Sequence, residues 1–301
     1  MQRITMRKLL PGLYSIDMEL IKTKQELNEK IIQLRNENKT IGFVPTMGAL
    51  HQGHLSLVEA AGKQCDEVVV SIFVNPSQFN DPGDLERYPR DLDKDMNLLK
   101  NTACELLFAP SVEEVYPETD ERVFDFGALD KVMEGEHRPG HFNGVAQVVS
   151  RLFEMVKPDK AFFGQKDFQQ LAIVREMERQ LNSGIEIVAC PIVREADGLA
   201  MSSRNMLLTK KHRKSAPLIA KTLKESCNFV PFKNIAEIKA FVIGSINGDE
   251  NLGVEYFDVV DGNTLQPVDR WEDSSYIVGC IAVFAGKIRL IDNIIYKNPG
   301  K

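Results

Sequence analysis

Up to about residue 190, short apolar runs alternate with segments whose apolar residues recur at helical spacing. The runs are rich in β-branched residues, as in strands that are buried on both faces of a parallel sheet. Alternating strands and helices predict a doubly wound α/β domain. The strands are expected at residues 40–44, 68–74, 160–163 and 185–189, with a further one just after Met18.

Helical segments fill the gaps between these runs. Thr23 and Glu26 have the spacing of a capping box, which predicts a helix from there to about Asn38. Further helices are expected at residues 54–62, 91–101, 144–156 and 167–181.

Beyond residue 190 the pattern changes to helices followed by strands. Helices are expected at residues 210–227 and 234–247, and strands at 254–260, 276–285 and 287–291. Gly286 would close a hairpin between the last two strands. This α+β pattern predicts a smaller C-terminal domain over residues 193–301, packed without a flexible linker against an N-terminal domain over residues 18–192.

Composition and charge narrow the class of protein. The 301 residues are 43% hydrophobic and 27% charged, and the formal net charge of −6 argues against a dedicated nucleic-acid binder. The five cysteines are scattered and form no CxxC pair, so we expect reduced thiols in a cytoplasmic protein rather than a disulfide framework or a zinc site. No apolar stretch reaches the roughly 20 residues of a membrane span, so no membrane partner is expected.

The most informative stretch is FVPTMGALHQGH, residues 43–54. It connects an expected strand to an expected helix, and ligands of parallel sheets bind at the carboxyl ends of strands beside helix N-termini. His51 and His54 can share one face and donate hydrogen bonds to phosphate, and Gly53 leaves room for a nucleotide. A metal site would need further ligands, and none is obvious nearby. Alternatively, one histidine packs in the loop and the other caps the helix.

Two other segments carry phosphate-compatible groups. Lys166 could meet a phosphate at the start of an expected helix, where Asp167 could accept a ribose hydroxyl or simply cap the helix. In the segment MSSRN, Ser202, Ser203 and Arg204 could grip phosphates in a mobile loop, or the segment could be an ordinary polar loop.

Three further segments have weaker signals. Asn75 and Gln78 follow the strongest strand, where they could orient a hydroxy acid or form a plain Asn-Pro turn. Residues 138–142 (RPGHF) form a basic turn that could line a substrate rim, and the carboxylates of residues 88–95 (YPRDLDKD) are expected at a solvated helix start. Together the segments place polar groups after successive strands of one sheet, which predicts an enzyme acting on a nucleoside triphosphate.

With these segments in their order and spacing, the chain closely resembles the pantothenate synthetase (pantoate–β-alanine ligase) family. The matching stretches are PTMGALHQGH, FVNPSQF, YPRDLDKD, RPGHFNGV, FGQKDFQQL and VREADGLAMSSRN, and the resemblance covers essentially all of the chain from about Met18 onward. It implies a Rossmann-like core of the HxGH nucleotidyltransferase type and a homodimer.

The resemblance also implies a two-step ligase that uses ATP with Mg²⁺. The carboxylate of pantoate attacks the α-phosphate of ATP, which gives an enzyme-bound pantoyl adenylate and pyrophosphate. The amine of β-alanine then attacks the acyl carbon and yields pantothenate, on the route to coenzyme A, and AMP. Such phosphoryl transfer needs positioning and charge neutralisation more than a protein nucleophile.

Each matched residue takes a role from the family's motifs. His51, His54 and Lys166 are expected to be catalytic, because they would bind the ATP phosphates and the departing pyrophosphate. The expected ATP contacts are Met47, Gly53, Gly164, Asp167, Val193, Met201, Ser202, Ser203 and Arg204. The expected pantoate contacts are Met47, Asn75, Gln78 and Gln170, with Asn75 also orienting β-alanine. Arg138 and His141 would shape the entrance, and Asp95 would contact magnesium.

A few positions depart from the family's usual pattern. Asp91 stands where many members have threonine, and we expect it to face solvent because another carboxylate would repel phosphates. Lys94 replaces an acidic residue beside Asp95, which weakens the magnesium assignment, and Phe168 replaces a frequent tyrosine. Residues 1–17 have no counterpart, and we expect a disordered extension or a misassigned start.

The sequence leaves three other functions open. A simple nucleotidyltransferase would share the HxGH segment but would not need the pocket at Asn75 and Gln78. A nucleotide-sensing protein could keep the fold without catalysis, although the intact set of His51, His54 and Lys166 favours an enzyme. A metal hydrolase fits least, because no third ligand stands at a familiar spacing.

Overall fold

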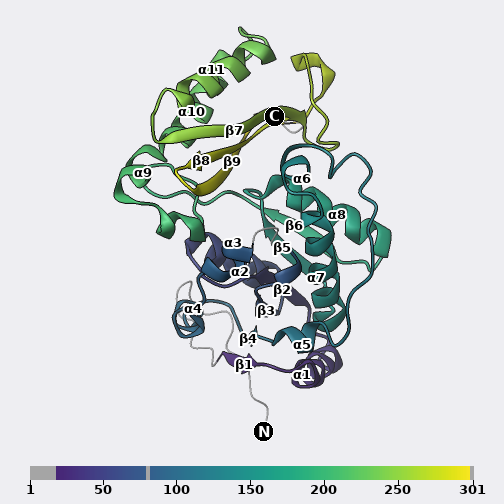
Figure 1. Ribbon diagram of the computed structural model, residues 1–301. Coiled ribbons are helices and arrows are strands. Elements are labelled where there is room, and N and C mark those ends of the chain that lie inside the picture. The colour runs from purple at the N-terminus through teal and green to yellow at the C-terminus, as the bar shows by residue number, and fades with distance from the viewer. Residues whose placement is uncertain (1–17, 79–81, 299–301) are drawn as a thin grey trace.

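A six-stranded parallel sheet and a three-stranded antiparallel sheet organise the chain, whose computed structural model describes residues 18–78 and 82–298 (Figure 1). Residues 1–17, expected to be an extension, lie outside the described residues. The larger sheet has the order β1-β4-β3-β2-β5-β6. Its strands are β1 (Glu19–Ile21), β2 (Ile41–Thr46), β3 (Glu67–Ile72), β4 (Leu106–Phe108), β5 (Lys160–Gly164) and β6 (Glu186–Cys190). The predicted doubly wound α/β fold is confirmed.

Helices cover both faces of the larger sheet. One face packs against α1 (Lys24–Asn36), α7 (His141–Val156) and α8 (Phe168–Leu181), and the other against α2 (Gln52–Gln64) and α4 (Leu92–Leu99). Neighbouring strand residues point to opposite faces, so Phe43 joins the first core and Val44 the second. Thr23 and Glu26 form the predicted capping box of α1.

Strand order creates the crevice in which ligands of such folds bind. The chain passes from β2 to β3 and β4 on one side, and places β5 and β6 on the other side of β2. The order therefore reverses between β2 and β5, and a switch point of this kind opens a crevice at the carboxyl ends of the strands. The loop with His51 follows β2 and the loop with Lys166 follows β5.

The C-terminal region is the smaller α+β unit that the sequence predicts. Its sheet consists of β7 (Leu252–Asp261), β8 (Ile277–Ala285) and β9 (Ile288–Lys297), and its helices are α9 (Lys210–Ser215), α10 (Leu218–Ser226) and α11 (Ile235–Asn247). Gly286 makes the expected turn between β8 and β9, with φ +64°. A shared apolar cluster joins Met133 and Phe168 to Val278 and Cys280. The boundary at residue 193 stays a prediction.

Several predicted element bounds were wrong. The single helix expected over residues 210–227 is divided into α9 and α10, because Pro217 has no amide hydrogen to continue the helix. Helix α7 begins at His141 rather than residue 144, and β9 runs on to Lys297 rather than residue 291. The elements that were not predicted are short: β4, α3 (Pro82–Arg87), α5 (Val112–Val115) and α6 (Met133–His137). Within the described residues, no helix is long and apolar enough to cross a membrane.

Candidate active site

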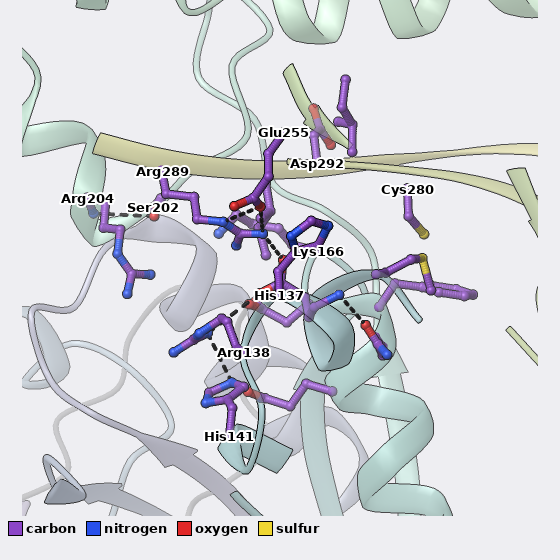
Figure 2. A pocket seen from close by; sticks show the side chains of 18 of the residues that line it. His137, Arg138, His141, Lys166, Ser202, Arg204, Glu255, Cys280, Arg289 and Asp292 are labelled. Carbon is purple, nitrogen blue, oxygen red and sulfur yellow. Dashed lines mark hydrogen bonds and ion pairs between the residues drawn. The ribbon is translucent and has the colours of Figure 1, made fainter. Parts of the chain in front are cut away.

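A cavity of about 780 Å³ lies between the carboxyl edge of the larger sheet and the C-terminal sheet (Figure 2). Residues near both sheets line it, so neither region alone makes the site. Half of the expected site residues are among its walls: Met47, Gln78, Arg138, His141, Lys166, Asp167, Gln170, Ser202 and Arg204. The others lie outside these walls: His51, Gly53, His54, Asn75, Asp95, Gly164, Val193, Met201 and Ser203.

The turn after β2 is shaped by a buried carboxylate. Gly48 has φ +80°, and a Cβ there would lie 2.9 Å from Asp95 Oδ2, so the turn requires glycine. The two oxygens of Asp95 accept hydrogen bonds from Ala49 N at 2.9 Å and Leu50 N at 2.7 Å. Asp95 thus anchors the loop that leads to His51.

The two histidines of the HxGH segment form a capping box at the start of α2. His51 Nδ1 accepts from Gly53 N at 3.1 Å, and His54 Nδ1 accepts from His51 N at 3.3 Å. Since each Nδ1 is an acceptor, each neutral ring carries its hydrogen on Nε2 and can donate it to a ligand. A Cβ on Gly53 would lie 2.8 Å from His51 Cε1, so glycine is needed for this cap. Capping and phosphate binding are therefore compatible, although the sequence presented them as alternatives.

The electrostatics of this helix start keep both rings neutral. Burial, and then the positive charge of Lys166, lowers the pKa of His51 to about 4. Burial lowers the pKa of His54 to about 3, with smaller contributions from His51 and Lys166. The loops after β2 and β5 are therefore close enough for their charges to interact. An anion placed between them would meet two neutral N–H donors, an ammonium group and a helix N-terminus.

The loop after β5 leaves its polar side chains available. Asn293 Nδ2, on β9, donates to the carbonyl oxygens of Gln165 at 2.8 Å and Lys166 at 3.0 Å, so the C-terminal sheet holds this loop in place. Asp167 occupies the N-cap position of α8 but its carboxylate makes no capping hydrogen bond, and it is exposed on the cavity wall. A Cβ on Gly164 would meet no atom within 4 Å, which leaves open space beside the end of β5.

The MSSR segment lies against the HxGH segment. Met201 N donates to Val193 O at 3.0 Å, which brings together the two ends of this loop. Met201 Cβ would lie 3.7 Å from a Cβ on Gly53. Ser202 Oγ caps the short helix η2 (Ser203–Leu207) by accepting from Arg204 N. The structure thus joins the segments after β2, β5 and β6 at one place.

A second group of polar residues surrounds the turn after β3. Gln78 Nε2 lies 2.7 Å from Met47 Sδ. The main chain of this turn packs against Gly144 near the start of α7. His141 Nδ1 donates to Gln78 O at 2.8 Å, so its Nε2 accepts from Arg138 Nη1 at 3.1 Å. Burial, and then Arg138, lowers the pKa of His141 to about 4. Asn75 is fully buried behind Gln78 and does not reach the cavity.

Ion pairs across the cavity were not predicted from the sequence. Arg289, on β9, pairs with Glu255 on β7 (Figure 2). It also lies 2.6 Å from Glu134 on α6. Tyr256 Oη donates to Glu134 Oε1 at 3.0 Å, and Arg138 lies 3.6 Å from the same carboxylate. Burial by itself raises the pKa of Glu134, but these cations hold it below its usual value. The available signal was a charged residue within an apolar strand, as in LGVEYF and KIRLID.

Tyr88 is a further residue whose position the sequence did not predict. It is buried and its hydroxyl bonds the side chain of Ser203; burial raises its pKa and this hydrogen bond opposes the rise. Nearby, Asp91 is exposed, as expected, and caps α4 by accepting from Lys94 N at 3.0 Å. Phe168 packs edge-on to the ring of Tyr276.

The donor set around Asp95 does not fit a protein-held magnesium ion. Both carboxylate oxygens already accept main-chain hydrogen bonds, and the side chain is only 2% exposed. Among the described residues, no group of three or more histidine, cysteine or acidic side chains could hold a metal ion. A magnesium ion would therefore need oxygen ligands from a substrate.

The chain is similar to known proteins over nearly its whole length. The sequence profile of the family described as Pantoate-beta-alanine ligase matches residues 19–295. The pantothenate synthetase of Phocaeicola vulgatus is 57% identical over 93% of this chain and 100% of the relative, and that of Porphyromonas gingivalis strain W83 is 54% identical over the same shares.

Solved structures agree with these relatives. The crystal structure of pantothenate synthetase from Thermus thermophilus is 42% identical, with a TM-score of 0.87 over 93% of this chain and 100% of that chain. That of pantoate-beta-alanine ligase from Francisella tularensis, complexed with beta-gamma ATP and beta-alanine, is 33% identical, with a TM-score of 0.79 over 93% and 98%.

Proposed function

The chain belongs to the pantoate–β-alanine ligase family, and from this premise we propose how its cavity divides the work of the reaction. The enzyme condenses pantoate with β-alanine, using ATP, to give pantothenate, AMP and pyrophosphate. The observation that carries the assignment of roles is the histidine capping box, because it uses only the two Nδ1 atoms and leaves both Nε2–H donors free of the cap, within reach of the charge of Lys166.

The first step takes place where the loops after β2 and β5 meet. The β- and γ-phosphates of ATP accept hydrogen bonds from His51 and His54 and are neutralised by Lys166 and Arg204. Both rings are neutral before ATP binds, so they donate hydrogen bonds without repelling Lys166. Negative charge that develops on the departing pyrophosphate is then stabilised by donors already in position, which lowers the barrier to attack by the pantoate carboxylate.

The nucleoside and pantoate occupy neighbouring parts of the crevice. Asp167 makes no capping hydrogen bond and accepts a hydrogen bond from a ribose hydroxyl. The open space at Gly164 admits the nucleoside beside Val193 and Met201. Gln78 and Gln170 on the cavity wall bind the hydroxyl and carboxylate of pantoate against Met47. β-Alanine then enters past Arg138 and His141 and attacks the acyl carbon of the adenylate.

Magnesium enters as part of the ATP complex rather than as a resident ion. The contacts of Asp95 support this proposal, because both of its carboxylate oxygens accept hydrogen bonds from the amides of Ala49 and Leu50. The acidic composition and the scattered cysteines support a cytoplasmic enzyme, and the family resemblance supports a homodimer.

The two-step order can be tested by measuring pyrophosphate and AMP separately. With ATP, magnesium and pantoate alone, we expect up to about one pyrophosphate per active site, followed by AMP only when β-alanine is added. Pyrophosphate release that does not depend on pantoate would instead identify a simple nucleotidyltransferase.

The same assay, after chelation and stepwise return of magnesium, tests the source of the magnesium ligands. An Asp95→Asn variant should be slower, because the loop before His51 loses one acceptor, but should show the wild-type magnesium midpoint. A midpoint displaced more than about tenfold, the loss expected when a ligand or its immediate support is removed, would make Asp95 a magnesium ligand.

A further inference from the structure

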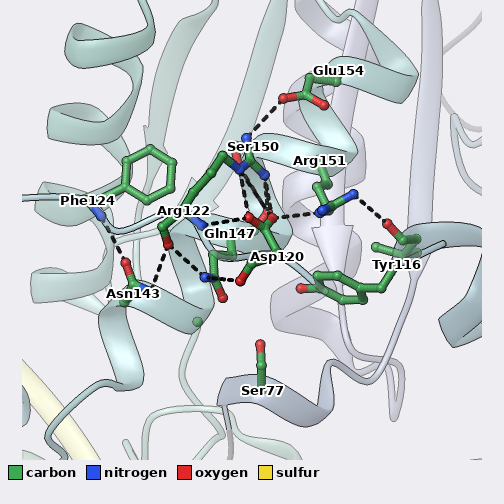
Figure 3. Close-up of polar contacts among 12 residues, drawn as sticks. Ser77, Tyr116, Asp120, Arg122, Phe124, Asn143, Gln147, Ser150, Arg151 and Glu154 are labelled. Atoms are coloured by element: carbon green, nitrogen blue, oxygen red, sulfur yellow. Dashed lines mark hydrogen bonds and ion pairs between the residues drawn. The ribbon is translucent and has the colours of Figure 1, made fainter. Parts of the chain in front are cut away.

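Helix α7 carries a polar stripe that the reaction does not use directly. Asn143, Gln147 and Arg151 recur every four residues, which places them on one face of a helix that is otherwise almost wholly buried. Asn143 bonds Arg122 O and Phe124 N, and Gln147 Nε2 donates to the carbonyl oxygens of Asp120 at 2.9 Å and Arg122 at 2.8 Å. The stripe thus holds an irregular segment, residues 116–124, along the helix (Figure 3).

A buried carboxylate locks this segment to α7. Asp120 is 3% exposed at its side chain and accepts from Arg151 Nε at 2.6 Å and from Arg122 Nη2 at 2.7 Å (Figure 3). The hydrogen bond from Arg122 contributes most to holding the pKa of Asp120 far below its usual range, so the carboxylate stays charged. Paired and hydrogen-bonded charges of this kind define one geometry strongly.

The locked segment determines where the hydroxyl of Tyr116 lies. Arg151 Nη1 donates to Val115 O at 3.3 Å, and its guanidinium group lies 5.1 Å from the centre of the Tyr116 ring. Tyr116 Oη then donates to Asn75 Oδ1 at 3.1 Å. Burial raises the pKa of Tyr116, so this hydroxyl remains a donor at neutral pH.

The orientation of the Asn75 amide follows from its neighbours. Its Oδ1 accepts from Tyr116 and from Ser77 Oγ at 3.1 Å, while its Nδ2 donates to Gly144 O at 3.1 Å. Asn75 Nδ2 also faces Gln78 Oε1 at 3.5 Å, which leaves Gln78 Nε2 on the side of Met47 and the cavity. A Cβ on Gly144 would lie 2.7 Å from Ser77 O, so this turn and α7 touch backbone to backbone.

We propose that Tyr116 is a positioning residue for pantoate, which orients the Gln78 amide through Asn75 while Arg151 and Asp120 hold Tyr116 in place. The proposal rests on the proposed role of Gln78 in binding pantoate. In this arrangement Gln78 presents an N–H donor to the cavity, which suits the carboxylate or hydroxyl oxygen of a hydroxy acid. Asn75 then supports the site without contacting the substrate.

Tyr116→Phe removes only the hydroxyl and tests this proposal. We expect the KM for pantoate to rise about 3- to 10-fold, the value of one net hydrogen bond, with kcat and the KM values for ATP and β-alanine within about twofold. Tyr296→Phe is the matched control, because it removes a hydroxyl that lies 2.7 Å from Ser226 Oγ in the C-terminal region. This control should lower thermal stability to a similar extent, but it should not raise the pantoate KM relative to the KM values for ATP and β-alanine.

A double-variant cycle shows whether the effect passes through Gln78. In a Gln78→Ala background, adding Tyr116→Phe should raise the pantoate KM by less than about twofold, because the group that Tyr116 orients is gone. The proposal would be overturned if Tyr116→Phe raised the pantoate KM by the same factor in the Gln78→Ala background as in the wild type. It would also be overturned if Tyr116→Phe alone raised all three KM values equally or left the pantoate KM unchanged.

Two further measurements, the activity of the wild type and the pantoate KM of Gln78→Ala, distinguish failure of this proposal from failure of the proposed function. Wild-type enzyme that makes no pantothenate would remove the proposed function itself. Active wild-type enzyme with a normal pantoate KM in Gln78→Ala would leave the ligase activity intact and overturn both the role of Gln78 and the positioning role of Tyr116.

Discussion

The active site has two sides, the HxGH edge of the larger sheet beside the cavity and an ionic wall of the cavity itself, and they are built in different ways. On the sheet edge, His51 and His54 are held by main-chain amides within a few residues of themselves. On the ionic wall, Arg289 is held by Glu134, about half a chain away in sequence, and by Glu255. The contacts of the histidine edge are local and neutral, whereas those of the ionic wall are long-range and charged.

Because of this difference, we expect substitutions on the two sides to affect different properties of the enzyme. The histidines on the sheet edge are neutral, and each uses Nδ1 in a hydrogen bond of the cap while Nε2 can bind a ligand. Removing Nε2 should therefore change the free energy of unfolding little. The ionic wall connects the C-terminal sheet to α6, and removing Arg289 leaves Glu255 without this cation and Glu134 with only Arg138 at 3.6 Å. We therefore expect substitutions at the sheet edge to lower kcat, and substitutions in the ionic wall to lower the free energy of unfolding.

The largest effect is expected for Arg289→Met. Breaking a buried ion pair by removing one partner costs about 3–5 kcal/mol, because the remaining charges stay desolvated. The free energy of unfolding should fall by this amount in a denaturant titration at pH 7, while kcat of the folded enzyme falls less than tenfold.

Arg179→Met is the matched control for that variant. Arg179 pairs with Glu176 on the surface of α8, where its side chain is 73% exposed, so the same substitution should cost less than about 1 kcal/mol. Equal losses in the two variants would show that the ionic wall contributes no more than a surface pair.

The next effect is a loss of rate in His54→Asn. The asparagine amide can replace Nδ1 as the acceptor for His51 N but has no atom at the position of Nε2. Removing one donor to a developing negative charge should lower kcat for pyrophosphate formation about 10²- to 10³-fold. The unfolding midpoint should stay near that of the wild type; a rate within tenfold of wild type would contradict the role of Nε2.

The sequence indicated the histidine edge of the sheet because the residues that form it are contiguous in the chain. The strand before FVPTMGALHQGH, the glycine turn and the histidine spacing all lie within one short stretch, and a parallel sheet brings the ends of its strands to one edge. The parallel sheet without its short strand β4, the C-terminal α+β unit and the convergence of the loops after β2, β5 and β6 could be predicted in this way. The order of strands could not, since apolar runs do not say which neighbours pair.

The ionic wall was missed because a charged residue within an apolar strand, the one local signal, does not say which distant residue pairs with it. Glu134 and Arg289 are ordinary charged residues in sequence, and their pairing depends on how β9 faces α6. The same holds for Tyr116, which bonds Asn75 only because the segment after it is bound to α7. The polar stripe of α7 was readable at four-residue spacing, but its partners were not.

The smallest effect tests His141, which stands where the two sides meet. Its pKa of about 4 lies below the value of 6.5 expected in the unfolded chain. Between these values the unfolded state binds a proton that the folded state does not, so acidification favours unfolding and stability rises with pH through this window. One such group should cost about 1–2 kcal/mol between pH 7 and pH 5.

His141→Asn isolates this contribution, because the amide nitrogen can still donate to Gln78 O but does not titrate. Denaturant titrations at pH 7 and pH 5 should therefore show a loss about 1–2 kcal/mol smaller in the variant than in the wild type. Between pH 7 and pH 8 the two proteins should have parallel stability curves, since neither state gains a proton at residue 141. If the curves stay parallel down to pH 5, His141 titrates normally, and burial and the charge of Arg138 do not hold its ring neutral in the folded enzyme.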